Sequence, residues 1–184
     1  DHATSKIKQE LLEPLSAVHD SLKQDFDARG AIDHTLAEEA PSIEEEATAH
    51  RIISLAMQAT RRCAGDDQYS AEGQGVYRTQ AQPERLNQPT IETLINYGLL
   101  KTGEIKTADD ITTSKINELF LAARDSADPE TTKKIISTLL PQSKFTTENV
   151  GHFTVAAPAY APLTNPIRDF ASLLTGRRLK SIFN

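Results

Sequence analysis

The amino-acid sequence predicts an all-α protein, a helical bundle in two halves joined by a long polar loop and followed by an extended, proline-containing carboxyl-terminal arm. The apolar residues favour helices, since the 184 residues include 18 Leu and 22 Ala but 4 Val, 4 Tyr and no Trp, whereas sheets prefer β-branched and aromatic side chains. Apolar residues also recur at steps of three or four, which is the spacing of amphipathic helices. The length fits one domain or a compact pair of subdomains.

Residues 1–65 are predicted to form an acidic amino-terminal helical region. Pro14 lies inside the first apolar stripe and lacks an N–H group, so either the helix kinks there or a second segment begins; we expect a kink. The second helix is expected to begin at Ser42, a favoured N-cap residue, and to end near Gly65. The apolar stripe of the first helix consists of Ile7, Leu11, Leu15, Val18, Leu22 and Phe26.

Residues 66–88 are predicted to be a polar linker, and residues 89–145 a carboxyl-terminal helical region. The linker shows no periodicity, and loops of this length are uncommon inside compact domains. It is either a boundary between the two halves or a binding loop that becomes ordered on a partner, and we expect a boundary. Thr102 and Gly103 lie between two short apolar stretches, which indicates a tight turn or a small hairpin. Proline and glycine positions predict three helices in this region, over residues 89–97, 109–125 and 129–140.

Residues 146–184 are predicted to form an extended arm, a short helix and a basic tail. Prolines exclude a helix from the first part of the arm, while Asn165 and Pro166 indicate a last helix that ends at Gly176. The apolar side chains of the arm cannot all be hidden within an extended segment, so a groove of the same chain or of another copy must receive them. The predicted partner-binding residues are Phe153, Val155, Tyr160, Leu163, Arg177, Arg178 and Lys180.

Charge is distributed unevenly along the chain. The net charge is −6 overall, with −8 over residues 1–50 and +3 over residues 151–184. Oppositely charged ends favour head-to-tail association of copies. Three basic residues make a small surface for nucleic acid, and the rest of the chain is acidic, so we expect any nucleic-acid contact to be limited to the basic tail.

The sequence shows no complete catalytic or metal-binding motif, and we expect no cofactor. Glu46 and His50 share one helix face but offer two metal ligands at most, without the His-Glu-x-x-His pattern of zinc proteases. Cys63 follows an apolar helix face and is expected in the core. As the single cysteine it cannot form a disulfide within the chain, which favours a reducing compartment such as the cytoplasm. No run reaches the roughly 20 apolar residues that span a bilayer, so a soluble protein is expected.

These observations favour a non-enzymatic structural or assembly subunit, as in a capsid, a nucleoprotein coat or a secretion machine. Such a subunit would bind other protein chains, including copies of itself, through the carboxyl-terminal arm. A first alternative is an adaptor or effector that binds a partner through its amphipathic first helix. A second alternative is a hydrolase with a site near His50 that uses Glu46 and Cys63.

Overall fold

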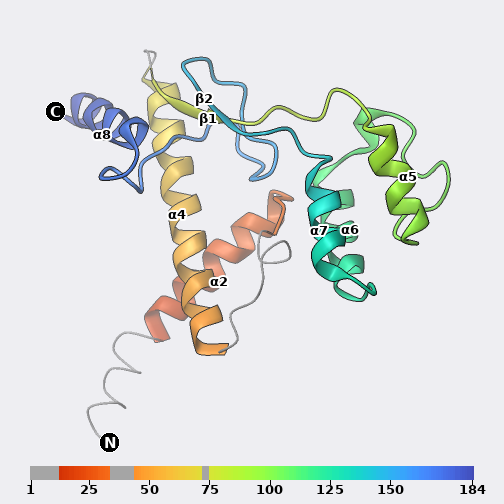
Figure 1. The fold of residues 1–184 in the computed structure, drawn as a ribbon. Coiled ribbons are helices and arrows are strands. Elements are labelled where there is room, and N and C mark those ends of the chain that lie inside the picture. Colours follow the sequence, from red (N-terminus) through yellow and green to blue (C-terminus); the bar gives the residue numbers. More distant parts are fainter. Residues whose placement is uncertain (1–12, 34–43, 72–74) are drawn as a thin grey trace, which may run out of the picture.

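The computed structural model describes residues 13–33, 44–71 and 75–184. Figure 1 shows two groups of helices connected by a short two-stranded sheet. The first group packs on one long helix and contains α2 (Glu13–Ala28), α4 (Glu44–Ser70) and α8 (Phe170–Phe183). The second group contains α5 (Gln88–Asn96), α6 (Thr113–Arg124) and α7 (Pro129–Ser137), with a 3-10 turn, η2 (Ala108–Asp110). The sheet is formed by β1 (Tyr77–Thr79) and β2 (Lys144–Thr146).

The prediction of an all-α bundle is wrong, because β1 and β2 form an antiparallel pair in which Arg78 lies opposite Phe145. Isolated bridges of His152 with Gln80 and with Ala157 extend the pairing into the arm. Each strand has three residues, which is too short to produce a recognisable alternation of polar and apolar residues. Strand β1 also lies inside the predicted linker, whose polar composition indicated a loop.

Helix α4 does not end at Gly65, as the sequence predicted, but continues to Ser70. Gly65 allows the arm to lie directly against the helix, because a Cβ atom at this position would be 2.6 Å from both the carbonyl carbon of Ala159 and the backbone nitrogen of Tyr160. The preceding Ala64 is 2% exposed. The glycine therefore serves close packing and does not terminate the helix.

Helices α5 and α7 begin within one residue of the predicted positions 89 and 129, and α7 ends at Ser137, before the predicted residue 140. The side chain of Asn87 accepts a hydrogen bond from the backbone N–H of Thr90, and that of Asp128 accepts one from Thr131. Both helices have proline in the first turn, where a missing N–H group costs nothing. Gly98 follows α5 with φ of +72°, in the left-handed region that favours glycine.

Of the two alternatives for residues 99–106, the structure shows the tight turn, in which the N–H of Glu104 donates to the carbonyl of Lys101 at 3.1 Å, and no strand pairing.

Two other segments differ from the predicted extents. Residues 108–110 form η2 before α6, because the carboxylate of Asp110 accepts hydrogen bonds from two preceding backbone N–H groups. Helix α8 begins after its N-cap, Asp169, and passes through Gly176 to Phe183, so the predicted basic tail is helical.

The first predicted helix is observed as α2, with Pro14 in its first turn. Ile7 and Leu11 of the predicted stripe lie outside the described residues. Val18 is 53% exposed, whereas Phe26 is 3% exposed. Within the described part of this stripe, burial is therefore strongest near the carboxyl end of the helix.

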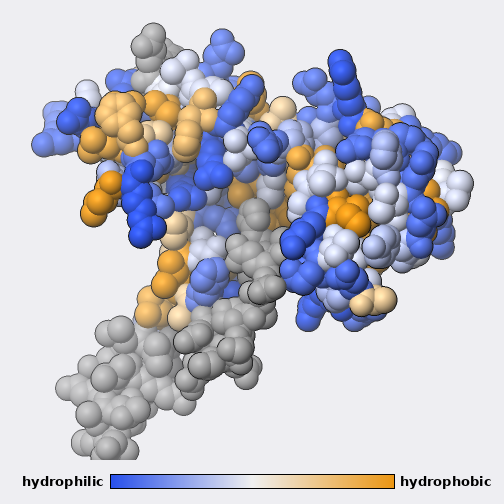
Figure 2. Space-filling model, in the orientation of Figure 1, coloured by the Kyte–Doolittle hydropathy of each residue, from blue (hydrophilic) through white to orange (hydrophobic). Residues whose placement is uncertain are grey.

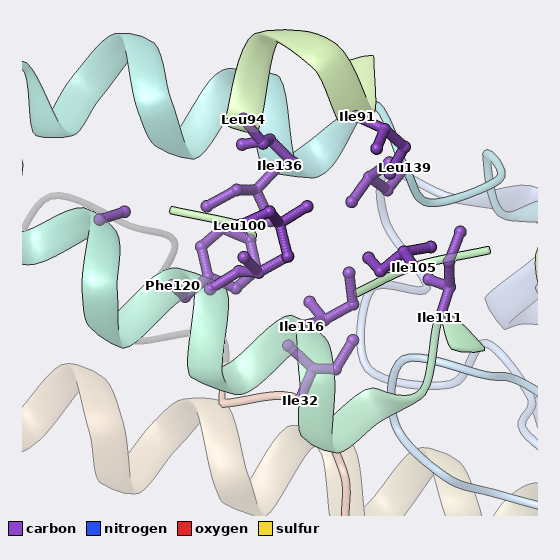
Figure 3. Close-up of a cluster of buried hydrophobic side chains, with 12 residues drawn as sticks. Ile32, Ile91, Leu94, Leu100, Ile105, Ile111, Ile116, Phe120, Ile136 and Leu139 are labelled. Atoms are coloured by element: carbon purple, nitrogen blue, oxygen red, sulfur yellow. The ribbon is translucent and has the colours of Figure 1, made fainter. Parts of the chain in front are cut away.

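The main hydrophobic core lies in the second helix group (Figure 3). Ile32, which follows α2, joins this core from the first group. The side chain of Asn117 holds the segment by donating to the carbonyl of Ala31 at 3.0 Å and accepting from the backbone N–H of Asp33 at 2.9 Å. The core residues are Ile32, Ile91, Leu94, Leu100, Ile105, Ile111, Ile116, Leu119, Phe120, Ala123, Ile136 and Leu139.

Apolar surface is also exposed at and beside the last helix. Figure 2 shows hydrophobic side chains gathered over α8, and Ile167, Phe170 and Phe183 are 99%, 70% and 70% exposed. No helix within residues 13–33, 44–71 and 75–184 is both long and apolar enough to cross a membrane.

Substitution Gly65→Ala is expected to lower the free energy of unfolding by about 2–3 kcal/mol, because the added methyl group meets backbone atoms that cannot move aside cheaply. The matched control is Gly176→Ala in α8, where the nearest atom to the new Cβ is Leu163 Cδ1 at 3.9 Å. This control should raise the stability by about 0.5–1 kcal/mol, since alanine is the better helix former. Urea unfolding followed by circular dichroism measures both, and equal effects of the two substitutions would contradict the packing argument.

Substitution Asp128→Ala is expected to lower the Tm at pH 7 by removing the N-cap of α7. Hydrogen bonds from the Thr131 side chain and backbone hold the pKa of Asp128 below its ordinary value of 3.8. A lowered pKa means that the carboxylate stabilises the fold above pH 3.8 and that this contribution is lost as the pH falls through the folded-state value. The Tm difference should therefore shrink at acidic pH in thermal unfolding. Asp109→Ala, at an exposed carboxylate, is the control, and a difference independent of pH would refute the prediction.

Candidate functional site

A polar cleft with a volume of about 360 Å³ lies where α4, the end of β1 and the arm meet. We call it the arginine cleft, because two guanidinium groups from different elements line it. Its polar lining includes Gln58, Arg61, Arg78, Gln80, His152 and Thr154.

Helix α4 contributes Gln58 and Arg61, which lie one turn apart on the same helix face. The Arg61 Nε atom donates to the hydroxyl of Thr164 at 2.9 Å, and its carbonyl accepts from the backbone N–H of Ala161 at 3.0 Å. The bond to Thr164 is the one hydrogen bond that the Arg61 side chain makes within the described residues, so its two terminal amino groups are available to a ligand. The Gln58 Oε1 atom is buried and has no hydrogen-bond partner in the same part of the chain.

Strand β1 contributes Arg78. Its backbone N–H donates to the carbonyl of Tyr160 at 2.8 Å, and its Nε donates to the hydroxyl of Ser143 at 3.1 Å. The guanidinium carbon lies 6.0 Å from the ring centroid of Phe145, within the range of a cation–π interaction. The side chain is thus fixed against β2 while its terminal amino groups remain free of hydrogen bonds in the described part of the chain.

Gln80 joins the end of β1 to the arm. The residue is 8% exposed, and its Nε2 donates to the carbonyl of Pro141 at 2.7 Å. Its Oε1 accepts hydrogen bonds from the backbone N–H of Thr154, at 3.0 Å, and from the Thr154 hydroxyl. Its backbone adds two bonds, to the carbonyl of Gly151 and from the N–H of Phe153. One buried amide therefore sets the position of the arm beside the cleft.

The arm folds back on itself at the cleft. His152 and Ala157 exchange two backbone hydrogen bonds, at 2.9 and 3.3 Å, around Ala156 with φ of 45°, a strained value for a residue other than glycine. The His152 ring meets the Tyr160 ring edge to face, with centroids 5.0 Å apart. Arg29, which follows α2, contacts this turn by donating to the carbonyl oxygens of Val155 and Ala156.

The described residues that line the arginine cleft carry a net positive charge. None of the described residues that line it is acidic, and Arg61 and Arg78 both keep their charge at any ordinary pH. In β1, burial raises the pKa of the Tyr77 hydroxyl, so this phenol stays neutral. Planar guanidinium groups at a concave surface favour an anion such as a phosphate.

The structure places the predicted apolar contacts of the arm largely in the interior of the same chain. Val155 and Tyr160 are each 4% exposed, Phe153 is partly buried against the main core, and Leu163 is half-buried. The groove that these side chains required is therefore supplied by the same chain.

The predicted basic contacts lie on α8, away from the arginine cleft lining. Arg177 and Lys180 are exposed, whereas Arg178 is half-buried and donates to the carbonyl of Ala71 at 3.5 Å.

The residues proposed for a hydrolase near His50 do not form a compact site. His50 is exposed on α4, the side chain of Glu46 lies outside the described residues, and Cys63 is exposed, so the expectation of a core cysteine is wrong. Within the described ranges no group of three or more His, Cys, Asp or Glu side chains could hold a metal ion.

Sequence reasoning missed Arg61, Arg78 and Gln80 as site residues. Arg61 lies near the predicted end of the second helix, where a basic residue is ordinary helix electrostatics, and the other two lie in the predicted linker. No local signal marks these positions, since the cleft forms only when three distant segments meet.

Comparison with known proteins gives a family match over the whole chain: the model of the RNB domain matches residues 1–184. Exoribonuclease 2 of Psychromonas ingrahamii is 30% identical over 142 residues, which cover 76% of this chain and 21% of that protein. Ribonuclease R of Vibrio parahaemolyticus is 28% identical over 181 residues, which cover 92% of this chain and 21% of that protein. The chain thus spans about a fifth of the length of these curated relatives.

Solved structures show the same fold. RNase R of Mycoplasma genitalium matches with a TM-score of 0.76 and 19% identity in its apo form, and equally in its complex with ribose-methylated single-stranded RNA, over 91% of this chain and 28% of that chain. Yeast Ssd1, described as a pseudonuclease, matches with a TM-score of 0.53 and 18% identity over 72% of this chain and 16% of that chain.

These similarities overturn the predicted function. A non-enzymatic structural or assembly subunit is wrong, as is the prediction that the chain is not part of an enzyme, because the RNB domain match covers every residue and the curated relatives are ribonucleases. The hydrolase alternative was nearer, although it named other residues. The fold is therefore similar to that of RNase R, and the predicted fold class, an all-α bundle, is wrong.

Substitution Gln80→Met is expected to lower the free energy of unfolding by about 2–3 kcal/mol, because it leaves the buried N–H of Thr154 and the half-buried carbonyl of Pro141 without their partner. Amide hydrogen exchange at Thr154 should accelerate more than exchange in α6. The control is Gln82→Met at a neighbouring exposed position, which should change neither quantity. Slow exchange at Thr154 in the Gln80→Met variant would show that Gln80 does not hold the arm.

Proposed function

This chain belongs to the RNB domain family, and we propose that it forms the RNA-binding cleft of a ribonuclease that hydrolyses phosphodiester bonds in RNA. The names of its curated relatives, Exoribonuclease 2 and Ribonuclease R, support this reaction class. Since the chain spans about a fifth of those relatives, the proposal assigns it the binding of RNA and assigns hydrolysis to the complete polypeptide that carries these residues.

The observation that carries the proposal is the arginine cleft, where Arg61 from α4 and Arg78 from β1 face one cavity without acidic neighbours among its described lining residues. Each guanidinium is fixed through Nε, which leaves paired terminal N–H donors for phosphate oxygens. The cavity volume of about 360 Å³ lies in the range of small-ligand sites, so one nucleotide unit fits the space.

Nucleic acid is the partner that the similarities support best. The Mycoplasma genitalium RNase R structures include complexes with single-stranded and with double-stranded RNA. The exposed Arg177 and Lys180 of α8 offer a further phosphate contact, as expected for the basic tail. Association with other copies of the chain, expected from its oppositely charged ends, stays a prediction.

RNA binding without hydrolysis is the second candidate. The fold similarity to yeast Ssd1, described as a pseudonuclease, favours it, and it uses the same cleft.

Substitutions Arg61→Gln and Arg78→Gln are each expected to weaken binding of a short single-stranded oligoribonucleotide about tenfold, because each removes one charged donor pair. The slope of log affinity against log salt concentration should fall by about 0.7 for each arginine lost, as expected for one phosphate contact on a single strand. Fluorescence anisotropy measures both quantities. Arg124→Gln, at an exposed arginine of α6, is the control and should change neither.

Hydrolysis of an end-labelled RNA by the complete polypeptide decides between the two candidates. Shortened products support the ribonuclease, and tight binding without products supports the second candidate. If the chain does not bind RNA, or if Arg124→Gln weakens binding as much as the cleft substitutions, the proposed role of the arginine cleft is wrong.

A further inference from the structure

Phe145 of β2 is an exposed aromatic residue in contact with Arg78, which lines the arginine cleft. It is 52% exposed and belongs to neither of the two buried hydrophobic clusters. The antiparallel register places it directly opposite Arg78, so the two side chains lie on the same face of the sheet. Burial of apolar surface therefore does not explain the presence of a phenylalanine here.

Arg78 covers one side of this ring and also lines the cleft. Its guanidinium carbon is 6.0 Å from the Phe145 ring centroid. The same side chain donates through Nε to the hydroxyl of Ser143 at 3.1 Å, and Ser143 lies two residues before Phe145 and lines the cleft. The ring is thus held next to the cleft by a residue whose terminal N–H donors make no hydrogen bond within the described residues.

An aromatic ring beside a phosphate-binding arginine is the arrangement that single-stranded nucleic acids favour. Bases stack on aromatic side chains while guanidinium groups hold the backbone, and stacking tolerates any base because every base has a π-face. A cation beneath the ring also attracts its electron density. The exposed Lys144, next to Phe145 on β2, adds positive charge at the same edge.

We propose that Phe145 is a base-stacking residue. One base of a single-stranded RNA lies on the exposed side of the Phe145 ring, and Arg78 holds a phosphate next to that base. This inference rests on the proposed function and deepens it, because it assigns a platform for an unpaired base. It also predicts a preference for single-stranded over fully paired RNA, since a base inside a duplex has no free face.

The test compares the chain with its Phe145→Leu and Phe145→Tyr variants. Phe145→Leu should weaken binding of a single-stranded oligoribonucleotide about tenfold, whereas Phe145→Tyr should keep the affinity. On an abasic ribose-phosphate chain of the same length, Phe145→Leu should have no effect, because there is no base to stack. Phe170→Leu changes a phenylalanine of α8 that is 70% exposed and is the matched control; it should leave both affinities unchanged.

The outcomes separate this inference from the proposed function. If Phe145→Leu binds the base-containing RNA as well as the unaltered chain does, while Arg78→Gln still weakens binding, stacking is wrong and the arginine cleft stands. If Phe145→Leu weakens both ligands equally, the ring has a structural role and stacking is wrong. If the unaltered chain binds no RNA, both proposals fail. Urea unfolding of each variant verifies that the exposed substitution leaves the fold intact.

Discussion

The close contact between helix α4 and the arm at Gly65 is the constraint on which the rest of the site depends. No side chain larger than hydrogen fits there, because a Cβ atom would lie 2.6 Å from the arm's backbone. With the two backbones this close, the Arg61 carbonyl accepts the N–H of Ala161, and the N–H of Arg78 donates to the carbonyl of Tyr160. The arm thereby bonds to the helix and to β1 at successive residues. The arginine cleft is the space that these three elements leave beside their contact.

Two side-chain amides, the buried one of Gln80 and the half-buried one of Asn117, connect the helix groups to this contact. Gln80 fixes the arm to the end of β1, and Asn117 fixes the segment after α2 to α6. The N–H of Ile32, a residue of the main core, also donates to the carbonyl of Thr154 at 2.8 Å. This hydrogen bond joins the main core directly to the arm. Buried polar groups of this kind specify one arrangement, because any other arrangement leaves them unpaired at a cost of about 1–3 kcal/mol each.

The sequence predicts those elements whose ends carry their own chemistry. Pro89 and Pro129 lie in the first turns of α5 and α7, and Asp128 caps α7 with a local hydrogen bond, so each helix start is visible in a few letters. Gly65 appears as a stop in the same letters, yet it lies inside α4, because its role is set by the arm far along the chain. Strands β1 and β2 have three residues each, which is too short to show an alternation of polar and apolar residues in the sequence. The site follows the same rule, since Arg61 and Arg78 become neighbours of one cavity through tertiary contacts alone.

The contrast between the cleft and the predicted basic tail shows why residue type alone does not identify a binding site. Arg177 and Lys180 lie on an exposed helix face, and the described part of the chain gives their side chains no hydrogen-bond partner. Holding such side chains against a ligand costs rotamer entropy of up to about 2 kcal/mol each. Arg61 and Arg78 are already oriented by Thr164 and Ser143, so they have less freedom to lose on binding. We therefore expect the two oriented arginines of the cleft to bind a phosphate more strongly than the exposed Arg177 and Lys180, although the charges are equal. The difference arises because folding has already fixed the cleft side chains.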